Sequence, residues 1–151
     1  MIKPRKLGHL VIRVRDVQRS EEFYTKVLGL EVKHRARGTM VFFRSNHEVD
    51  HDLAISQIGE DAAGPDPDRV GLYHMAWELA GMDELKDAYK VVVDNGVGIA
   101  GFGDHGDVKG LYILDPDGIE IELYAEAPEF ENTPLEEILT GKSRQGAAAG
   151  Q

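Results

Sequence analysis

Histidine offers the widest choice of chemistry in this chain of 151 residues. Six histidines stand at positions 9, 34, 47, 51, 74 and 105. The sequence contains no cysteine, which excludes thiolate nucleophiles, cysteine-ligated zinc and iron–sulfur clusters. Any metal ion must therefore be held by imidazole and carboxylate groups.

Two of the histidines occupy matching places in an internal repeat. The segment Leu7-Gly8-His9-Leu10 superposes on Leu72-Tyr73-His74-Met75, and each is followed by a strand pattern, a helix pattern and a glycine. Equivalent residues of two such halves tend to face one another across a pseudo-twofold axis. The repeat therefore predicts that His9 and His74 share a site.

A carboxylate for that site comes from the last predicted strand, Ile119 to Tyr124. Its alternation places Glu120, Glu122 and Tyr124 on one face and apolar residues on the other. Two imidazoles and one carboxylate match the facial triad that binds ferrous iron and leaves coordination positions open.

We therefore predict His9, His74 and Glu122 as metal ligands. In the alternative interpretation, His9 and His74 are ordinary strand histidines with hydrogen-bond partners, and Glu122 pairs with an arginine such as Arg13.

The elements that must position these residues follow the hydrophobic pattern. Asp16 is suited to cap a helix that buries Val17, Ser20, Tyr24, Val27 and Leu28 and ends at Gly29. Strands are predicted at Leu7–Val14, Leu30–Arg35, Met40–Arg44 and Leu53–Ile58. The first half is thus a βαβββ module.

The second half repeats this order after a breaker-rich linker, Gly59 to Arg69. A strand is predicted at Leu72–Leu79, a helix at Met82–Asn95, and further strands that include Gly110–Leu114 and Ile119–Tyr124. The intervening Asp115-Pro116-Asp117-Gly118 is a tight hairpin signal. We expect one α+β domain at residues 1–131, built from modules at about 5–58 and 70–126, and a partly flexible tail at 132–151.

Composition excludes several classes of function. Seventeen Lys and Arg stand against 27 Asp and Glu, and this net charge of −10 would repel a nucleic-acid backbone. No long uncharged apolar run is present, so no membrane span is expected. The basic N-terminus lacks the apolar region of a signal peptide, which predicts a cytoplasmic protein.

Several motifs give the chain a family resemblance. The segments Leu7-Gly8-His9-Leu10-Val11, Phe23-Tyr24, Val27-Leu28-Gly29-Leu30 and 111–118 resemble the vicinal oxygen chelate superfamily of glyoxalases, bleomycin-resistance proteins and extradiol dioxygenases. The resemblance covers residues 5 to 126. It implies paired βαβββ modules that curl into a cup-shaped mixed sheet around a divalent metal, but it does not by itself identify the reaction.

Further segments are similar to the catalytic domain of extradiol catechol dioxygenases: His51-Asp52-Leu53-Ala54, residues 72–78, Asp104-His105-Gly106, residues 109–112 and residues 119–123. This similarity implies His51 as the acid–base residue, with His105 and Tyr112 hydrogen-bonded to bound substrate. It also implies Fe(II), with Mn(II) or another divalent metal as alternatives, an aromatic diol and O2 as substrates, and a homodimer. The alternatives are a surface histidine at a strand end for His51, a flexible loop residue for His105 and core packing for Tyr112.

The chain departs from that pattern in two ways. It holds one pair of modules, whereas many extradiol enzymes carry a second, non-catalytic pair. The loop at His105 is also about one residue shorter than the family pattern. This difference weakens the role implied for His105 more than the assignment of the metal ligands.

Two other functions remain open at this stage. A glyoxalase-like or epimerase-like enzyme would use the metal to hold an enediolate and would need a fourth ligand, for which Gln57 is placed on the fourth predicted strand. A metal-free binding protein of the bleomycin-resistance type would not need His9, His74 and Glu122 together.

Overall fold

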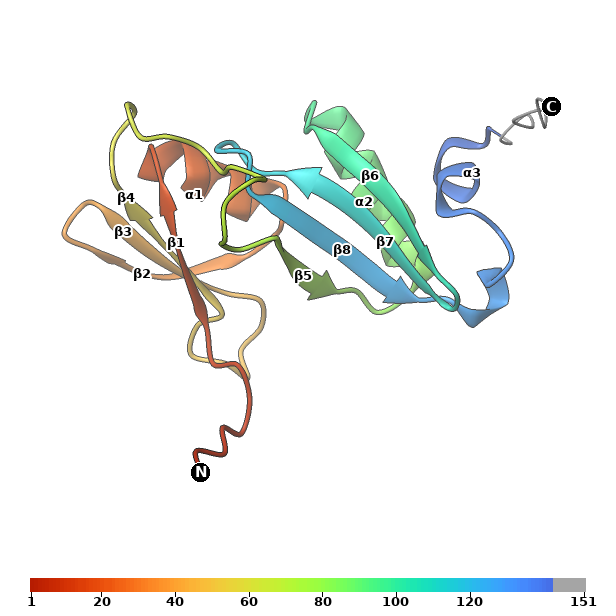
Figure 1. Cartoon of the computed structure of the whole chain (residues 1–151), viewed down its shortest axis with the longest axis horizontal. Helices are drawn as coiled ribbons and strands as arrows, with labels where there is room; N and C mark the ends of the chain where they lie inside the picture. The colour runs from red at the N-terminus through yellow and green to blue at the C-terminus, as the bar shows by residue number, and fades with distance from the viewer. Residues whose placement is uncertain (143–151) are drawn as a thin grey trace. The chain divides into compact units, whose positions relative to one another are not determined.

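The computed structural model describes residues 1–142, and these form two compact units (Figure 1). Unit 1 comprises Met1–Asp66 together with Pro116–Gly118. Unit 2 comprises Pro67–Asp115 and the chain from Ile119 onward.

Unit 1 is a four-stranded mixed sheet with one helix. Its elements are β1 (Leu10–Val14), α1 (Val17–Lys26), β2 (Glu31–Ala36), β3 (Met40–Arg44) and β4 (Leu53–Gln57). The strands lie in the order β1-β4-β3-β2, with β1 parallel to β4 and the other pairs antiparallel. Helix α1 contacts β4 and β3, and Tyr24, Phe43, Leu53 and Ile55 are fully buried in the core.

The start and end of α1 have clear local causes. Asp16 caps the helix as predicted, because its carboxylate accepts the backbone N–H groups of Gln18 and Arg19. The helix ends at Lys26, before the predicted Val27 and Leu28. The Val27 N–H still bonds the Phe23 carbonyl in the α-helical manner, but the Leu28 N–H bonds the same carbonyl instead of that of Tyr24 and so leaves the α-helical pattern. Gly29 then adopts the left-handed conformation, at φ 72°.

Unit 2 repeats the topology. Its elements are β5 (His74–Glu78), α2 (Met82–Asp94), β6 (Ile99–His105), β7 (Val108–Leu114) and β8 (Glu120–Glu126), followed by η1 (Pro128–Phe130) and α3 (Leu135–Thr140). The strands lie in the order β5-β8-β7-β6, with β5 parallel to β8. Helix α2 contacts β8 and β7, and α3 contacts β6 and β7. The predicted α+β class with two βαβββ modules is confirmed.

The first strand of each module is shorter than its hydrophobic pattern. Strand β1 begins at Leu10 rather than Leu7, and β5 begins at His74 rather than Leu72. The partner strands set these limits, because the paired register starts at Leu53 in β4 and at Glu120 in β8. Leu7 is consequently 75% exposed.

The C-terminal part is partly described. The short amphipathic pattern after residue 132 forms α3, whereas residues 143–151 of the predicted flexible tail lie outside the described residues. No helix within residues 1–142 combines the length and apolar character needed to cross a membrane.

Candidate functional site

Four polar side chains form a row across the sheet of unit 2, one from each strand in spatial order: His74 on β5, Glu122 on β8, Tyr112 on β7 and His105 on β6. His74 Nε2 lies 3.2 Å from Glu122 Oε2, and the Tyr112 hydroxyl donates to Glu122 Oε1 at 3.0 Å. His105 Nε2 lies 3.3 Å from the Tyr112 hydroxyl oxygen. We call these four residues the unit 2 row.

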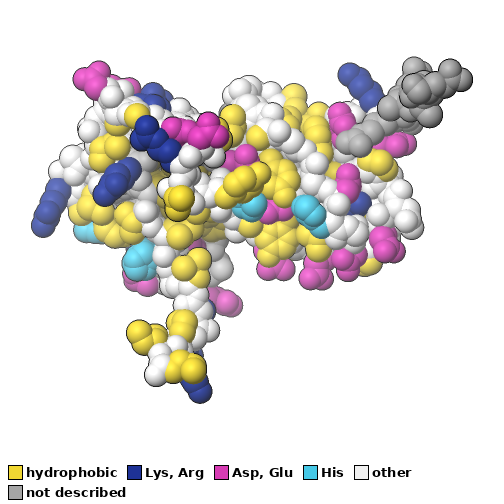
Figure 2. Space-filling view, in the orientation of Figure 1, with side chains coloured by type: hydrophobic (Ala, Val, Ile, Leu, Met, Phe, Trp, Pro, Cys, Tyr) yellow, Lys and Arg dark blue, Asp and Glu magenta, His cyan; other side chains and the backbone are white. Residues whose placement is uncertain are grey.

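Register explains why these residues meet. Tyr112 is the direct cross-strand partner of Glu122, and β5 runs parallel along the other side of β8. Paired residues of neighbouring strands project from the same face of the sheet. Figure 2 shows histidine and acidic side chains next to one another on the visible surface of unit 2.

Burial in the unit 2 row is greatest at Glu122 and decreases towards His105. Glu122 is buried, Tyr112 and His74 are partly buried, and His105 is exposed. His74 Nδ1 is buried without a hydrogen-bond partner, with Glu120 Oε1 at 3.8 Å. Burial, followed by the hydrogen bond to Glu122, raises the pKa of Tyr112 to about 12. Tyr112 therefore stays a neutral hydroxyl donor near neutral pH.

Unit 1 carries a corresponding row of rings. His9 precedes β1, His51 precedes β4, Phe42 lies on β3 and His34 lies on β2, again in the spatial order of the strands. The centroid distances are 4.4 Å for His9–His51, 5.4 Å for His51–Phe42 and 5.9 Å for Phe42–His34. We call these four residues the unit 1 row.

The orientation of His51 is set by a residue that the sequence argument did not identify. His51 Nδ1 lies 2.7 Å from a carboxylate oxygen of Asp50, and this hydrogen bond lowers the pKa of Asp50. An ionised carboxylate can only accept, so Nδ1 carries the proton of this hydrogen bond. The carboxylate directly before a proposed acid–base histidine was the available signal for Asp50.

The predicted metal ligands are divided between the two units. His74 and Glu122 of unit 2 are in contact, and His9 belongs to unit 1. Within residues 1–142, no three His, Asp or Glu side chains are gathered as a complete metal-binding group.

The two donors of unit 2 nevertheless fit a divalent metal. An imidazole nitrogen of His74 and a carboxylate oxygen of Glu122 face one another. The Tyr112 hydroxyl donates a hydrogen bond to the other carboxylate oxygen of Glu122. The contacts of Glu122 within its own unit are thus to His74 and Tyr112, whereas Arg13, its alternative partner, belongs to unit 1.

Gln57 has a structural contact that bears on the lyase alternative. Its side-chain oxygen accepts a hydrogen bond from the backbone N–H of Val17 at 2.9 Å. This bond pairs one of the N–H groups in the first turn of α1 that have no partner within the helix. Gln57 therefore points to the helix-covered face of its sheet. The ring of Phe42, and with it the unit 1 row, lies on the other face, because Phe42 and Phe43 are successive residues of β3 and Phe43 packs against Tyr24 of α1.

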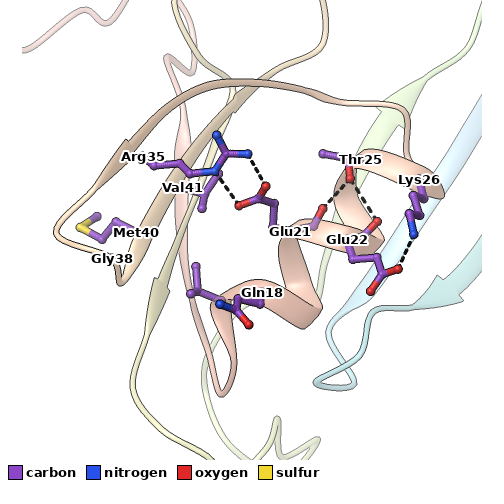
Figure 3. A pocket seen from close by; sticks show the side chains of 10 residues that line it. Gln18, Glu21, Glu22, Thr25, Lys26, Arg35, Gly38, Met40 and Val41 are labelled. Carbon is purple, nitrogen blue, oxygen red and sulfur yellow. Dashed lines mark hydrogen bonds and ion pairs between the residues drawn. The ribbon is translucent and has the colours of Figure 1, made fainter.

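A groove of about 580 Å³ lies elsewhere in unit 1, between α1 and the β2–β3 hairpin (Figure 3). Its lining includes Glu21 of α1 and Arg35 of β2, which form a two-point ion pair, together with Met40 and Val41 of β3. None of the predicted site residues lines this groove.

Known proteins resemble this chain in sequence and in structure. The chain is 31% identical over 122 residues to catechol-2,3-dioxygenase of Bacillus subtilis, a match that covers 81% of this chain and 42% of that protein. It is also 31% identical over 136 residues to lactoylglutathione lyase of Escherichia coli, covering 80% of this chain and 93% of the lyase. The chain spans about two fifths of the catechol dioxygenase that it matches.

A solved structure shares the fold. The glyoxalase/dioxygenase of Nostoc punctiforme superposes with a TM-score of 0.65 at 26% identity, covering 83% of this chain and 96% of the other. The sequence profile of the glyoxalase/bleomycin resistance protein/dioxygenase superfamily matches residues 6–123. With its two βαβββ modules, the chain belongs to this superfamily.

Proposed function

We propose that the chain is a metal-dependent extradiol dioxygenase that cleaves an aromatic vicinal diol with O2. The observation that carries this proposal is the unit 2 row, in which an imidazole and a carboxylate face one another beside a neutral phenol. That combination supplies two metal donors together with a hydrogen-bond donor for a bound oxygen atom.

His9, His74 and Glu122 would hold the metal, which we propose to be Fe(II), with Mn(II) as the alternative. Bound there, Fe(II) supplies open positions at which both diol oxygens and O2 are brought together. His74 and Glu122 are already oriented by their mutual contact, and Tyr112 restricts the Glu122 carboxylate further.

His51 is suited to move the protons of the reaction. Its Nε2 lone pair can accept a proton from a substrate hydroxyl, while Asp50 holds Nδ1 and stabilises the imidazolium that forms. The same nitrogen can later return that proton. The ring contact between His51 and His9, a proposed ligand, supports this role.

Tyr112 and His105 would bind the oxygen atoms of the substrate. The high pKa of Tyr112 keeps its hydroxyl protonated, so that it can donate to an anionic oxygen. His105 lies on the other side of that hydroxyl, at the exposed end of the unit 2 row.

The similarity to catechol-2,3-dioxygenase supports this reaction, although the match spans 42% of that protein. The resemblance also favours a homodimer, which light scattering of the purified chain would test.

A lyase of the glyoxalase type is the second candidate. The match to lactoylglutathione lyase, which spans 93% of that enzyme, favours it. The orientation of Gln57 argues against the simplest form of this candidate, because the proposed fourth ligand is bonded to α1 instead.

The deciding experiment is oxygen uptake by protein loaded with Fe(II) under anaerobic conditions and then given air and a panel of monocyclic and bicyclic catechols. One O2 consumed per diol, with a new yellow absorbance, would support ring cleavage. Bound metal without oxygen uptake, together with formation of lactoylglutathione when the same protein is instead given methylglyoxal and glutathione, would support the lyase. A chain that binds no metal would contradict both and favour a binding protein.

A further inference from the structure

Two glycines lie directly opposite one another beneath the unit 2 row. Gly103 of β6 and Gly110 of β7 are cross-strand partners. They leave a gap without side chains on the face of the sheet that carries the unit 2 row. Both glycines are buried, so the gap is filled by neighbouring atoms.

The Glu122 carboxylate occupies the space above Gly110. A Cβ atom at position 110 would overlap Glu122 Oε1 and lie 3.2 Å from the carboxylate carbon. The obstructed group is the end of a flexible side chain, so an alanine at this position can be accommodated by moving the carboxylate. Such a movement would take Glu122 away from His74 and Tyr112.

Tyr112 and His105 occupy the space above Gly103. A Cβ atom at position 103 would lie 2.8 Å from Cε2 of Tyr112 and 3.1 Å from Nε2 of His105. The first distance is shorter than any ordinary carbon–carbon contact, so the phenol ring would have to shift.

Backbone conformation does not explain either glycine. Neither residue has the positive φ that favours glycine, unlike Gly106 at the turn that follows. A glycine inside a strand is less favourable than a residue with a side chain. Gly101, on the same face of β6, shows the contrast, because a Cβ atom there would meet nothing within 4 Å.

We propose that Gly103 and Gly110 are positioning residues of the candidate site. Gly110 holds open the space in which the Glu122 carboxylate is presented to a metal, and Gly103 holds open the space for the Tyr112–His105 contact. The roles assigned to Glu122, Tyr112 and His105 rest on the proposed function, whereas the positions of these side chains above the two glycines rest on the geometry alone.

The first test is metal binding by Gly110→Ala, with Gly101→Ala as the matched control. Both substitutions add one methyl group to a strand glycine of the same sheet. We expect calorimetric titration with Mn(II) to show affinity at least about tenfold weaker for Gly110→Ala and unchanged for Gly101→Ala. Wild-type affinity in Gly110→Ala would overturn the assignment of Gly110.

The second test separates Gly103 from Gly110. Gly103→Ala should keep the Mn(II) affinity of the wild type, because neither Tyr112 nor His105 is a proposed ligand. Its kcat for diol cleavage should fall about tenfold, as expected when one oriented donor is displaced. A kcat equal to that of Gly101→Ala would overturn the role of Gly103.

A third test needs neither metal nor activity, so it holds if the proposed function fails. Urea unfolding compares Gly110→Ala with the wild type. It also compares the double variant Gly110→Ala, Glu122→Ala with Glu122→Ala alone. We expect Gly110→Ala to lower the urea midpoint only where Glu122 is present, since the obstructed atom is otherwise absent. Equal shifts in both backgrounds would overturn the proposal, and a Gly110→Ala chain that folds only together with Glu122→Ala would support it.

Discussion

Units 1 and 2 have equivalent strand orders, and each has a row of side chains from on or next to its four strands. In unit 1 the row is His9, His51, Phe42 and His34. In unit 2 the corresponding row is His74, Glu122, Tyr112 and His105. Both rows begin with a histidine at the start of the module, just before β1 in unit 1 and as the first residue of β5 in unit 2. They differ most at the second position, which is an imidazole in one and a carboxylate in the other.

The charge of the two units differs as strongly. Unit 1 contains eleven basic and eleven acidic side chains and is formally neutral, whereas unit 2 contains six basic and sixteen acidic ones and carries the entire net charge of −10. Acidic side chains gather along one edge of unit 2 in Figure 2. A negative field of this kind favours a cation.

The comparison shows that one topology can carry two different sets of side chains. The repeated βαβββ order fixes four positions on each sheet, and the side chains at those positions decide what each sheet does. Under the proposed function, unit 2 contributes the ligands His74 and Glu122, and His51 of unit 1 transfers protons. Four predictions compare the units, first through these proposed roles and then through stability.

Glu122→Ala should reduce metal affinity by more than about a hundredfold, because it removes a ligand rather than a group that merely orients one. Calorimetric titration with Mn(II) and the metal content of protein loaded with Fe(II) are the measurements. Glu126→Ala is the matched control, since Glu126 is an exposed carboxylate of the same strand. Wild-type metal content in the Glu122 variant would contradict the proposed role of unit 2.

His51→Ala should retain the metal and lose turnover by about 10² to 10⁴-fold, the usual contribution of a general acid–base group. Steady-state oxygen uptake measures kcat, and metal analysis of the same sample provides the internal control. Asp50→Asn should have a smaller effect in the same direction, because His51 remains but loses the carboxylate that orients its ring. Loss of metal from His51→Ala would show that unit 1 does not have the separate task inferred here.

A third prediction concerns the stability of unit 2. Lys109 is 1% exposed, its ammonium lies 2.9 Å from Asp104 Oδ1, and the same oxygen accepts the N–H of Leu135 at the start of α3. Asp104→Ala should cost about 3 kcal/mol, because it leaves a buried ammonium without this partner. Urea unfolding followed by the fluorescence of Trp77, the single tryptophan and part of β5, is the measurement.

The control for Asp104 is the opposite truncation. Lys109→Met removes the buried charge and keeps the volume, and the Asp104 side chain is 34% exposed and retains its bond to Leu135. This variant should be closer to the wild type in stability. Equal losses from both variants would show that packing, not the unpaired charge, determines the effect.

The smallest effect is expected in unit 1, at the ion pair that lines the groove in Figure 3. The hydrogen bond from Arg35 lowers the pKa of Glu21. A carboxyl group with a lower pKa in the folded state stabilises the fold above its unfolded pKa, and this stabilisation is lost as the pH falls through the folded pKa. The urea midpoints of the wild type and Glu21→Gln should therefore differ at pH 6 and converge towards pH 3.

That difference should also be small and sensitive to salt, because the Arg35 side chain is 61% exposed. Repeating the measurement in 1 M NaCl provides the control. A difference that persists at pH 3 would indicate that Glu21 acts through packing rather than through its charge.

Much of the fold could be predicted because the signals are local. The cap at Asp16 depends on a side chain two and three residues from the amides it binds. The turn at Asp115–Gly118 depends on the bond from the Ile119 N–H to the Asp115 carboxylate and on the positive φ of Gly118. The sequence does not delimit strand β6, because Gly101 and Gly103 weaken its strand pattern and pairing with β7 defines it.

The candidate site divides in the same way. Alternation along the last strand was enough to place Glu122 on a polar face, and the repeat was enough to relate His9 to His74. The sequence by itself thus determined the module order and the residue types available for chemistry, since both depend on periodicity and short-range bonds.

Tertiary structure alone decided which of those residues meet and what surrounds them. Four features depend on residues from different strands or helices. They are the contact of Glu122 with Tyr112, the space above Gly103 and Gly110, the burial of Lys109 and the orientation of Gln57 towards α1. The physical reason is that cross-strand register and burial arise only when the sheet is assembled, and a linear pattern does not specify them.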